Sequence, residues 1–154
     1  NRRHFFASGE NEIARARRYK SPLSMIMLDI DHFKLVNDHF GHPVGDKALI
    51  MVTQACLAAL RKVDILYRFG GEEFAVLLPE TSLDAAMVVA ERIRQSILDQ
   101  KLPTENGEVK LTASIGVAEL EAKTDTLLKL VDKADKALYR AKGEGRNCVR
   151  AFNS

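Results

Sequence analysis

The stretch LSMIMLDI, from Leu23 to Ile30, is a nearly unbroken apolar run that carries one aspartate, Asp29, near its end. Its length suits a β-strand, and the lack of an alternating polar side is typical of a strand that is covered on both faces. Such a strand lies in the middle of its sheet. The sequence therefore predicts that Leu23–Ile30 is the central strand, with the other segments arranged around it.

Several later segments have the apolar periodicity of helices. Residues 45–63 repeat apolar side chains at helical spacing, which predicts an amphipathic helix lying on the core. A second helix is expected to start at a capping box, Thr81–Asp84, and to run up to Pro103, and a third should cover residues 127–141. We expect the segment just after Pro103 to be an exposed loop, since turn-forming residues gather there.

The remaining segments look like short strands. ILYRF and EFAVLLP flank a pair of glycines, Gly70 and Gly71, which favours an antiparallel hairpin, while LTASIGV and the closing NCVRAF form two further strands. The order of strand, helices, hairpin, helix, strand, helix and strand predicts the α/β class. More narrowly, we expect an α+β sandwich whose mixed central sheet is flanked by helices.

Composition limits the kinds of protein that this chain can be. Its 154 residues are 46% hydrophobic, which suits one domain over residues 1–154 with a real core, and its net charge of +2 gives no field that would attract nucleic acid or a membrane surface. Two cysteines make no secreted disulfide framework, and no apolar run approaches the ~20 residues of a membrane span. We therefore expect a cytoplasmic domain, and the missing initial methionine indicates a fragment of a longer protein.

Two carboxylates, Asp29 and Asp31, stand where the predicted central strand ends. A buried aspartate needs a compensating charge, which a hard divalent cation supplies through oxygen ligands. The same residues could instead cap the next helix or face water. An EF-hand is disfavoured, because Lys34 and Phe40 stand where that loop needs glycine and glutamate.

Three histidines lie nearby, His32, His39 and His42. No cysteine or regular ligand spacing accompanies them, so zinc is disfavoured.

The hairpin RFGGEEF sets two adjacent acids, Glu72 and Glu73, beside the glycine pair. If this turn lies next to the end of the central strand, a glutamate and Asp29 can share a metal ion, which would offset their repulsion. Neighbouring side chains on a strand point to opposite faces, so the two glutamates should have different roles. The glycines would permit backbone conformations closed to other residues and leave room for a ligand. An ordinary solvated hairpin tip remains the alternative.

Basic and amide side chains elsewhere suit a nucleotide. Lys34, Lys142 and Arg146 could hold phosphates, although cations at a helix end also complement its dipole. Asn37 and Asp46 could read a base edge, because an aspartate accepts hydrogen bonds from the two adjacent donors of guanine. Helix caps and turns are the commoner use of both residue types.

Together these pieces resemble the GGDEF family of diguanylate cyclases, which condense two GTP molecules into cyclic di-GMP. The matching motifs cover essentially the whole chain: NRRHF at 1–5, DIDHFKLVND at 29–38, GHPVGD at 41–46, RFGGEEF at 68–74, LTASIGVA at 111–118 and ADKALYRAKGEGRN at 134–147. GGEEF departs from the name-giving GGDEF at its third letter, where glutamate is an accepted variant. The family's first motif normally begins a few residues before NRR, so we expect a trimmed front edge.

The resemblance implies a palm-like fold shared with polymerases and class III nucleotide cyclases, and a set of site residues. The groups implied to bind two Mg²⁺ ions, with Mn²⁺ as a possible substitute, are Asp29, the backbone carbonyl of Ile30, and Glu72. The residues implied to bind GTP are His32, Phe33, Lys34, Asn37, Asp46, Gly70, Gly71, Lys142 and Arg146. The catalytic residues implied are Glu72, Glu73 and Lys34.

The resemblance also implies how the domain works and is regulated. Each product contains two guanylyl units, so two copies facing each other across a two-fold axis would form the active enzyme, under an upstream regulatory domain. Arg61 and Asp64 form an R-x-x-D at the family's inhibitory spacing, and Arg92 resembles its second arginine, so cyclic di-GMP is an expected inhibitor. A surface ion pair is the simpler interpretation.

Two other functions remain open. A catalytically silent receptor would bind cyclic di-GMP through the inhibitory residues alone, although such relatives usually have a broken GGDEF motif, whereas this chain keeps every acid and base. A cyclase that also accepts ATP is disfavoured by Asp46, because a carboxylate suits the donors of guanine better than the edge of adenine.

Overall fold

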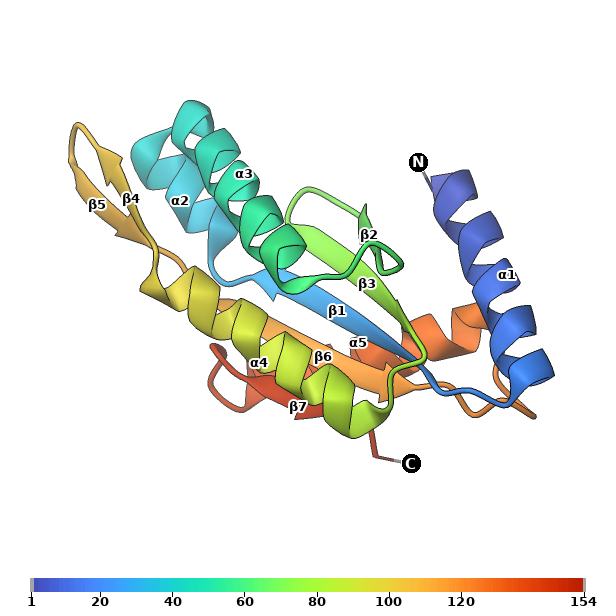
Figure 1. The fold of residues 1–154 in the computed structure, drawn as a ribbon. Helices are drawn as coiled ribbons and strands as arrows, with labels where there is room; N and C mark the ends of the chain where they lie inside the picture. The colour runs from blue at the N-terminus through green and yellow to red at the C-terminus, as the bar shows by residue number, and fades with distance from the viewer. Residues whose placement is uncertain (1, 154) are drawn as a thin grey trace.

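The computed structural model describes residues 2–153, in which five helices pack on a central sheet (Figure 1). The helices are α1 (Arg2–Tyr19), α2 (Phe33–Phe40), α3 (His42–Ala59), α4 (Leu83–Asp99) and α5 (Leu127–Gly143). The strands are β1 (Leu23–Ile30), β2 (Ile65–Arg68), β3 (Glu73–Pro79), β4 (Lys101–Thr104), β5 (Gly107–Lys110), β6 (Ala113–Glu119) and β7 (Val149–Ala151). The predicted α/β class is confirmed.

β1 is the central strand of the main sheet, as predicted. The strand order is β2-β3-β1-β6-β7, and every neighbouring pair is antiparallel except β6 and β7, which are parallel. All eight residues of β1 are buried, because the sheet is covered on both faces. The sheet is therefore mixed, and the end of β1 that carries Asp29 lies between β3 and β6.

The helices divide between the two faces of the sheet. Ile26, Leu28 and Ile30 point into an apolar cluster with α2, α3 and α4. Met25 and Met27, which alternate with them, point into a second cluster with α1 and α5. In Figure 1, α3 and α4 lie in front of the sheet and α5 lies behind it. The period of two along a strand thus divides one apolar run between two cores.

Helix α5 approaches the sheet very closely at Gly116 in β6. A Cβ atom built on this glycine would overlap the carbonyl oxygen of Ala134 and the backbone nitrogen of Leu138, both in α5. Two backbones can come this close only where no side chain separates them. Gly116 therefore fixes how deeply α5 sits against the sheet, and α5 carries Lys142 at its far end.

Four details of the predicted elements are wrong. The second predicted helix ends at Asp99 rather than near Pro103, and the segment after Pro103 is not a plain loop: β4 and β5 pair as an antiparallel hairpin with Gly107 at φ +108°. The helix cap is Ser82, whose hydroxyl accepts a hydrogen bond from the Ala85 amide at 3.3 Å, so the box does not start at Thr81. The first predicted helix runs from His42 to Ala59 rather than over residues 45–63.

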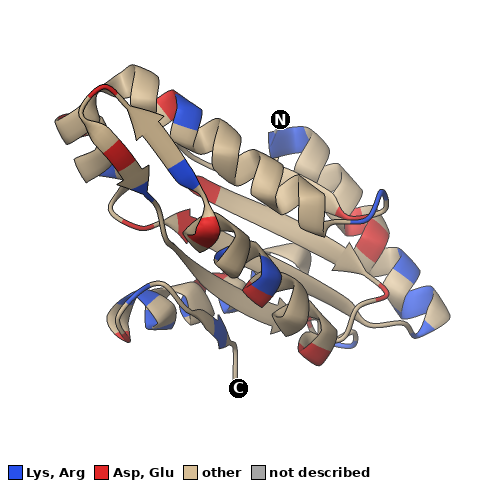
Figure 2. Ribbon diagram, turned by 60° about the vertical axis from the view of Figure 1, so that its left-hand side comes forward, with Lys and Arg blue, Asp and Glu red and all other residues tan. Residues whose placement is uncertain are grey.

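The structure shows mixed surface charge and no disulfide between the two cysteines, as the composition predicts. In Figure 2, acidic and basic residues are interspersed over the elements in view. Both cysteines are free thiols, and burial raises the pKa of Cys56 to about 12, so this thiol stays protonated and unreactive. Across residues 2–153, no helix combines the length and the apolar character needed to pass through a lipid bilayer.

Candidate active site

The acidic residues of two distant segments meet where β1 ends. Asp29 is the register partner of Glu73, the first residue of β3, and the Ile30 amide donates to the Glu72 carbonyl at 3.2 Å. These strands pair because their apolar residues share the same two cores. The hairpin is therefore held beside the central strand, as the sequence analysis required for a shared site.

Asp29 has one carboxylate oxygen that no other described group satisfies. The residue is only 6% exposed; its Oδ2 is paired with the ammonium of Lys142, whereas its Oδ1 is buried without a hydrogen-bond partner. A buried acceptor without a donor is unfavourable, more so when it is charged. Asp29 Oδ1 therefore suits a cation held by oxygen ligands.

The two glutamates repel Asp29 and are partly desolvated. Burial, followed by the negative charge of Asp29, raises the pKa of Glu72 above its usual value, while Lys142 acts in the opposite direction. The pKa of Glu73 is raised by the same two causes and also by Asp135 of α5. Nearby positive charge would relieve this repulsion. The acids thus form a region of negative charge that Lys142 offsets in part.

The acids have the right donor atoms for a metal ion, but they do not form a complete set of ligands. Among residues 2–153, no three His, Cys, Asp or Glu side chains converge closely enough to form a ready-made metal centre. An unpartnered carboxylate oxygen beside a second carboxylate matches Mg²⁺, which keeps several waters and typically takes one or two carboxylates plus phosphate oxygens from its substrate. The donor set therefore fits the implied ion, with the substrate completing its shell.

Arg68 holds the glycine turn in place, which the sequence analysis did not foresee. Its guanidinium donates to the carbonyls of Gly70 at 3.0 Å and Gly71 at 2.9 Å, and the Phe69 amide donates to the Glu73 carbonyl at 2.9 Å. Neither glycine has a positive φ, so the expectation of special backbone conformations is wrong. The expectation of space holds, because a Cβ at either position would meet no atom within 4 Å.

The turn between β1 and α2 presents backbone amides next to Asp29. His32 is in the left-handed region at φ +54°, and its carbonyl accepts hydrogen bonds from the amides of Leu35 at 3.0 Å and Val36 at 3.3 Å. The first amides of a helix have no intrahelical partner and carry partial positive charge. The amides of His32 and Phe33, with the exposed Lys34 side chain, therefore lie where a phosphate can be received.

Asn37 lies against the start of α3, beside the residue that precedes Asp46 in the chain, because that residue is Gly45. A Cβ on Gly45 would overlap Asn37 Oδ1, so the Asn37 side chain lies directly over the first turn of α3. Asp46 follows on that helix and lines a hollow of about 440 Å³ that Arg68 also borders. The two predicted base-reading residues are thus neighbours, and neither side chain acts as a helix cap.

The predicted inhibitory residues are not brought together as one closed site. Arg61 binds Asp64 at 2.8 Å and also donates to the Pro79 carbonyl at 2.7 Å and to Thr81 at 3.0 Å. Arg92 lies on α4, where it borders a hollow with polar neighbours of its own helix, and makes no ion pair with another described residue. The Arg61–Asp64 pair is therefore preformed, whereas Arg92 is free to take a ligand.

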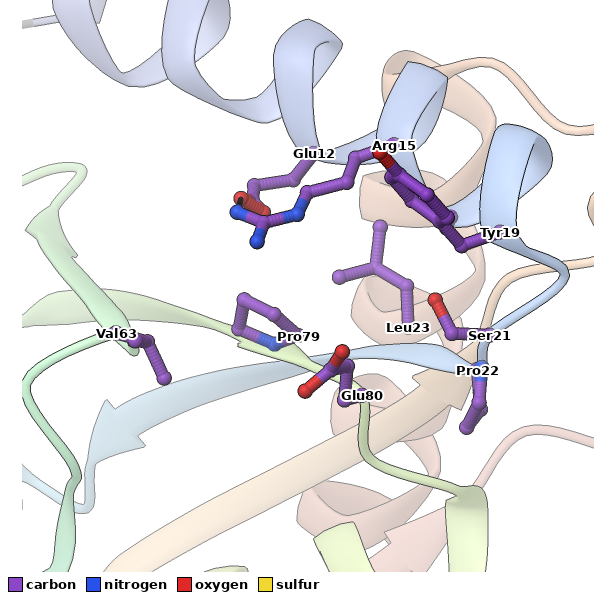
Figure 3. Close-up of a pocket in the computed structure, with 10 residues that line it drawn as sticks. Glu12, Arg15, Tyr19, Ser21, Pro22, Leu23, Val63, Pro79 and Glu80 are labelled. Carbon is purple, nitrogen blue, oxygen red and sulfur yellow. Dashed lines mark ion pairs between the residues drawn. The ribbon is translucent and has the colours of Figure 1, made fainter.

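A smaller cavity lies at the other end of β1, well away from these acids. Figure 3 shows Glu12, Arg15 and Tyr19 of α1 above Leu23, Pro79 and Glu80. Its volume of about 60 Å³ has room for waters and not for a nucleotide. This cavity is not part of the site at Asp29.

A mixed sheet of this topology, with acids at the end of its central strand and a hairpin beside it, defines a nucleotide-cyclase-like domain. The chain belongs to the GGDEF family, because the family described as "Diguanylate cyclase, GGDEF domain" matches residues 1–148. Diguanylate cyclase A of Treponema denticola is 43% identical over 130 residues, which are 84% of this chain and 35% of that protein. The chain therefore spans only part of such relatives.

Solved structures show the same family likeness. The active GGEEF domain of a diguanylate cyclase from Vibrio cholerae is 35% identical, with a TM-score of 0.93 over 100% of this chain and 97% of that one. The GGDEF domain of DgcB from Caulobacter crescentus, solved in complex with cyclic di-GMP, is 31% identical, with a TM-score of 0.95 over 100% of this chain and 89% of that one. The first of these carries the same GGEEF variant.

Proposed function

We propose that this chain is a diguanylate cyclase domain, which condenses two GTP molecules into cyclic di-GMP and two pyrophosphates. The single observation that carries the proposal is the buried, unpartnered oxygen of Asp29 beside the raised-pKa carboxyl of Glu72. Family membership and the name of the relative support it. The location that goes with this chemistry is the cytoplasm, where GTP is found.

The residues divide the work of the reaction between them. Asp29, the Ile30 carbonyl and Glu72 would hold Mg²⁺, or Mn²⁺ in its place. Held by these groups, the ion would supply positive charge that favours ionisation of the attacking 3′-hydroxyl and offsets the charge on the α-phosphate and pyrophosphate. The amides of His32 and Phe33 receive phosphate oxygens. The cations assigned to the triphosphate are Lys34, Lys142 and Arg146.

Selectivity for guanine is assigned to the pair formed by Asn37 and Asp46. The Asp46 carboxylate accepts from the guanine N1 and N2 donors, a pattern that adenine lacks. Glu73 faces the α5 side of the hairpin, where it lines a hollow with Asp135, Val131 and Phe69. Because Glu73 lies in different surroundings from Glu72, we assign it a separate role. Glu73 acts next to the reacting groups and does not bind the triphosphate.

One domain holds one nucleotide, so two copies must face each other to close the cyclic product. The 3′-hydroxyl of each GTP then attacks the α-phosphate of the other, with pyrophosphate leaving in both reactions. We expect the specific activity with GTP and Mg²⁺ to rise with protein concentration, because only the dimer turns over. A specific activity that stays constant over a hundredfold dilution would reject the dimer. If GTP is not converted to product while cyclic di-GMP binds tightly, the silent receptor is favoured.

Replacing Gly45 by alanine should disturb guanine recognition without unfolding the domain. The new methyl group displaces the Asn37 side chain, which can rotate away. We expect a GTP analogue with a methylene bridge between its α- and β-phosphates to bind about tenfold more weakly, the effect of one lost hydrogen bond to the base. Calorimetric titration measures this, and the same substitution in an Asn37→Ala background should change nothing further. An additional loss there would contradict the assignment.

Product inhibition through Arg61, Asp64 and Arg92 is part of the proposal, supported by the complex of the DgcB domain with cyclic di-GMP. We expect Arg92→Ala and Arg61→Ala each to weaken cyclic di-GMP binding about tenfold or more, because each removes a charged donor. Only Arg61→Ala should lower the unfolding temperature, since Arg61 also ties Pro79 and Thr81. Unchanged product affinity in Arg92→Ala would exclude α4 from the inhibitory site. An upstream regulatory domain remains an expected partner.

A further inference from the structure

The second aspartate of LDIDHFK, Asp31, is used differently from Asp29. Its Oδ1 accepts the Ser114 hydroxyl at 2.6 Å, and its Oδ2 accepts the Thr112 hydroxyl at 2.7 Å and the Asn147 amide at 3.0 Å. The residue is 7% exposed, and the bond to Ser114 is fully buried, whereas the other two are partly buried. Asp31 thus joins the end of β1 to the start of β6 and to the loop that follows α5.

The occupied oxygens make Asp31 a poor metal ligand. Each carboxylate oxygen has about two lone-pair directions, and Oδ2 already accepts two donors. Asp29 differs in this respect, since its Oδ1 has no partner. In the D-x-D pattern, Asp29 therefore has an oxygen available to an ion, whereas the carboxylate of Asp31 is used for hydrogen bonds within the protein.

The loop that Asp31 holds has an unusual backbone. Gly145, Arg146 and Asn147 have φ values of +115°, +61° and +46° in succession. Left-handed conformations are unfavourable for residues other than glycine and persist only where the surroundings hold them. Two contacts do so at Asn147: its amide binds Asp31, and its side-chain oxygen accepts from Arg94 of α4 at 2.8 Å.

Arg146 lies between the fixed points of this loop. Its amide donates to the Ala141 carbonyl at 3.0 Å, and the next residue is bound to Asp31 and Arg94. The Arg94 side chain is itself mostly buried and held by Glu91. The backbone on both sides of Arg146 is therefore anchored, although its side chain makes no ion pair with another described residue.

We propose that Asp31 is a positioning residue, which together with Arg94 fixes the Arg146 loop so that Arg146 meets the phosphates of a bound nucleoside triphosphate. This inference rests on the proposed function. Asp31 acts here only through the loop, by a carboxylate that accepts the Asn147 amide and two hydroxyls. Pre-organising a cation in this way favours phosphate binding, because less ordering is required when the ligand arrives.

The test is a double-mutant cycle between Asp31 and Arg146. We expect Asp31→Ala to weaken binding of the methylene-bridged GTP analogue about tenfold, while GMP, which lacks the β- and γ-phosphates, binds as before. In an Arg146→Ala background, Asp31→Ala should have little further effect, because the cation that it positions is gone. Additive losses, or an equal loss for GMP, would overturn the inference and leave Asp31 with a merely structural role.

Milder variants keep the test open if Asp31→Ala does not fold. Arg94→Gln and Asn147→Gly remove the same hydrogen bond from its two sides, and glycine tolerates the positive φ at 147. Each should weaken analogue binding about threefold, and the pair together no more than either alone. Unchanged affinity in both would refute the inference. A parent protein that does not bind the analogue at all would instead refute the proposed function.

Discussion

Replacing Glu72 by glutamine is expected to reduce cyclic di-GMP formation by a factor of about 10²–10³ or more, the scale on which removing a single charge-stabilising group acts. The substitution keeps the shape of the side chain and removes the charge that would hold Mg²⁺ beside Asp29. Product is measured by separating the nucleotides after incubation with GTP and Mg²⁺. Since the domain is proposed to work as a dimer, the assay belongs at high protein concentration.

The same substitution should not destabilise the fold. The pKa of Glu72 is raised in the folded protein by burial and by Asp29. A carboxyl with a raised folded pKa reduces stability at neutral pH, where it is ionised, so an uncharged amide relieves that repulsion. We expect an unfolding temperature equal to or above that of the parent.

A matched control is available on the same chain. Glu105 lies exposed at the turn between β4 and β5, and Glu105→Gln removes the same charge away from the acids. Its activity should stay at the parent level. Full activity in Glu72→Gln, or a comparable loss in Glu105→Gln, would show that the assignment of the metal ligand is wrong.

Gly116→Ala, which adds one methyl group, should destabilise the domain more than any other added methyl group in the sheet. The added Cβ meets backbone atoms of Ala134 and Leu138, which cannot rotate away as a side-chain end can. α5 must therefore shift outward, and we expect a loss of about 3 kcal/mol in the free energy of unfolding. For a chain of this length, that is a fall of roughly 10 °C in the unfolding temperature.

Gly143→Ala is the matched comparison for this substitution. Gly143 ends α5, and a Cβ there meets no atom within 4 Å. Alanine also has the higher helix propensity, so this variant should be as stable as the parent or slightly more stable. Both variants are compared by thermal and denaturant unfolding. Equal stabilities of the two alanine variants would contradict the close contact between β6 and α5.

The sequence alone determined the class of the fold and most of the residues that the site brings together. An apolar run without alternation can only be buried on both faces, which places β1 in the middle of the sheet whatever the details of its neighbours. The paired glycines and acids marked the hairpin, and the order of motifs identified the family. The hairpin of β4 and β5 was not predicted, since both strands are short, mostly exposed and only partly apolar.

Tertiary structure decided what each carboxylate does. Asp29 and Asp31 are equivalent in the sequence pattern, yet the chain folds three donors onto one and leaves an oxygen of the other without a partner. Those donors come from residues more than eighty positions away, and no local pattern reveals which distant groups will arrive. Hydrogen bonding and desolvation act over a few ångströms of space, and only the packed fold sets those distances.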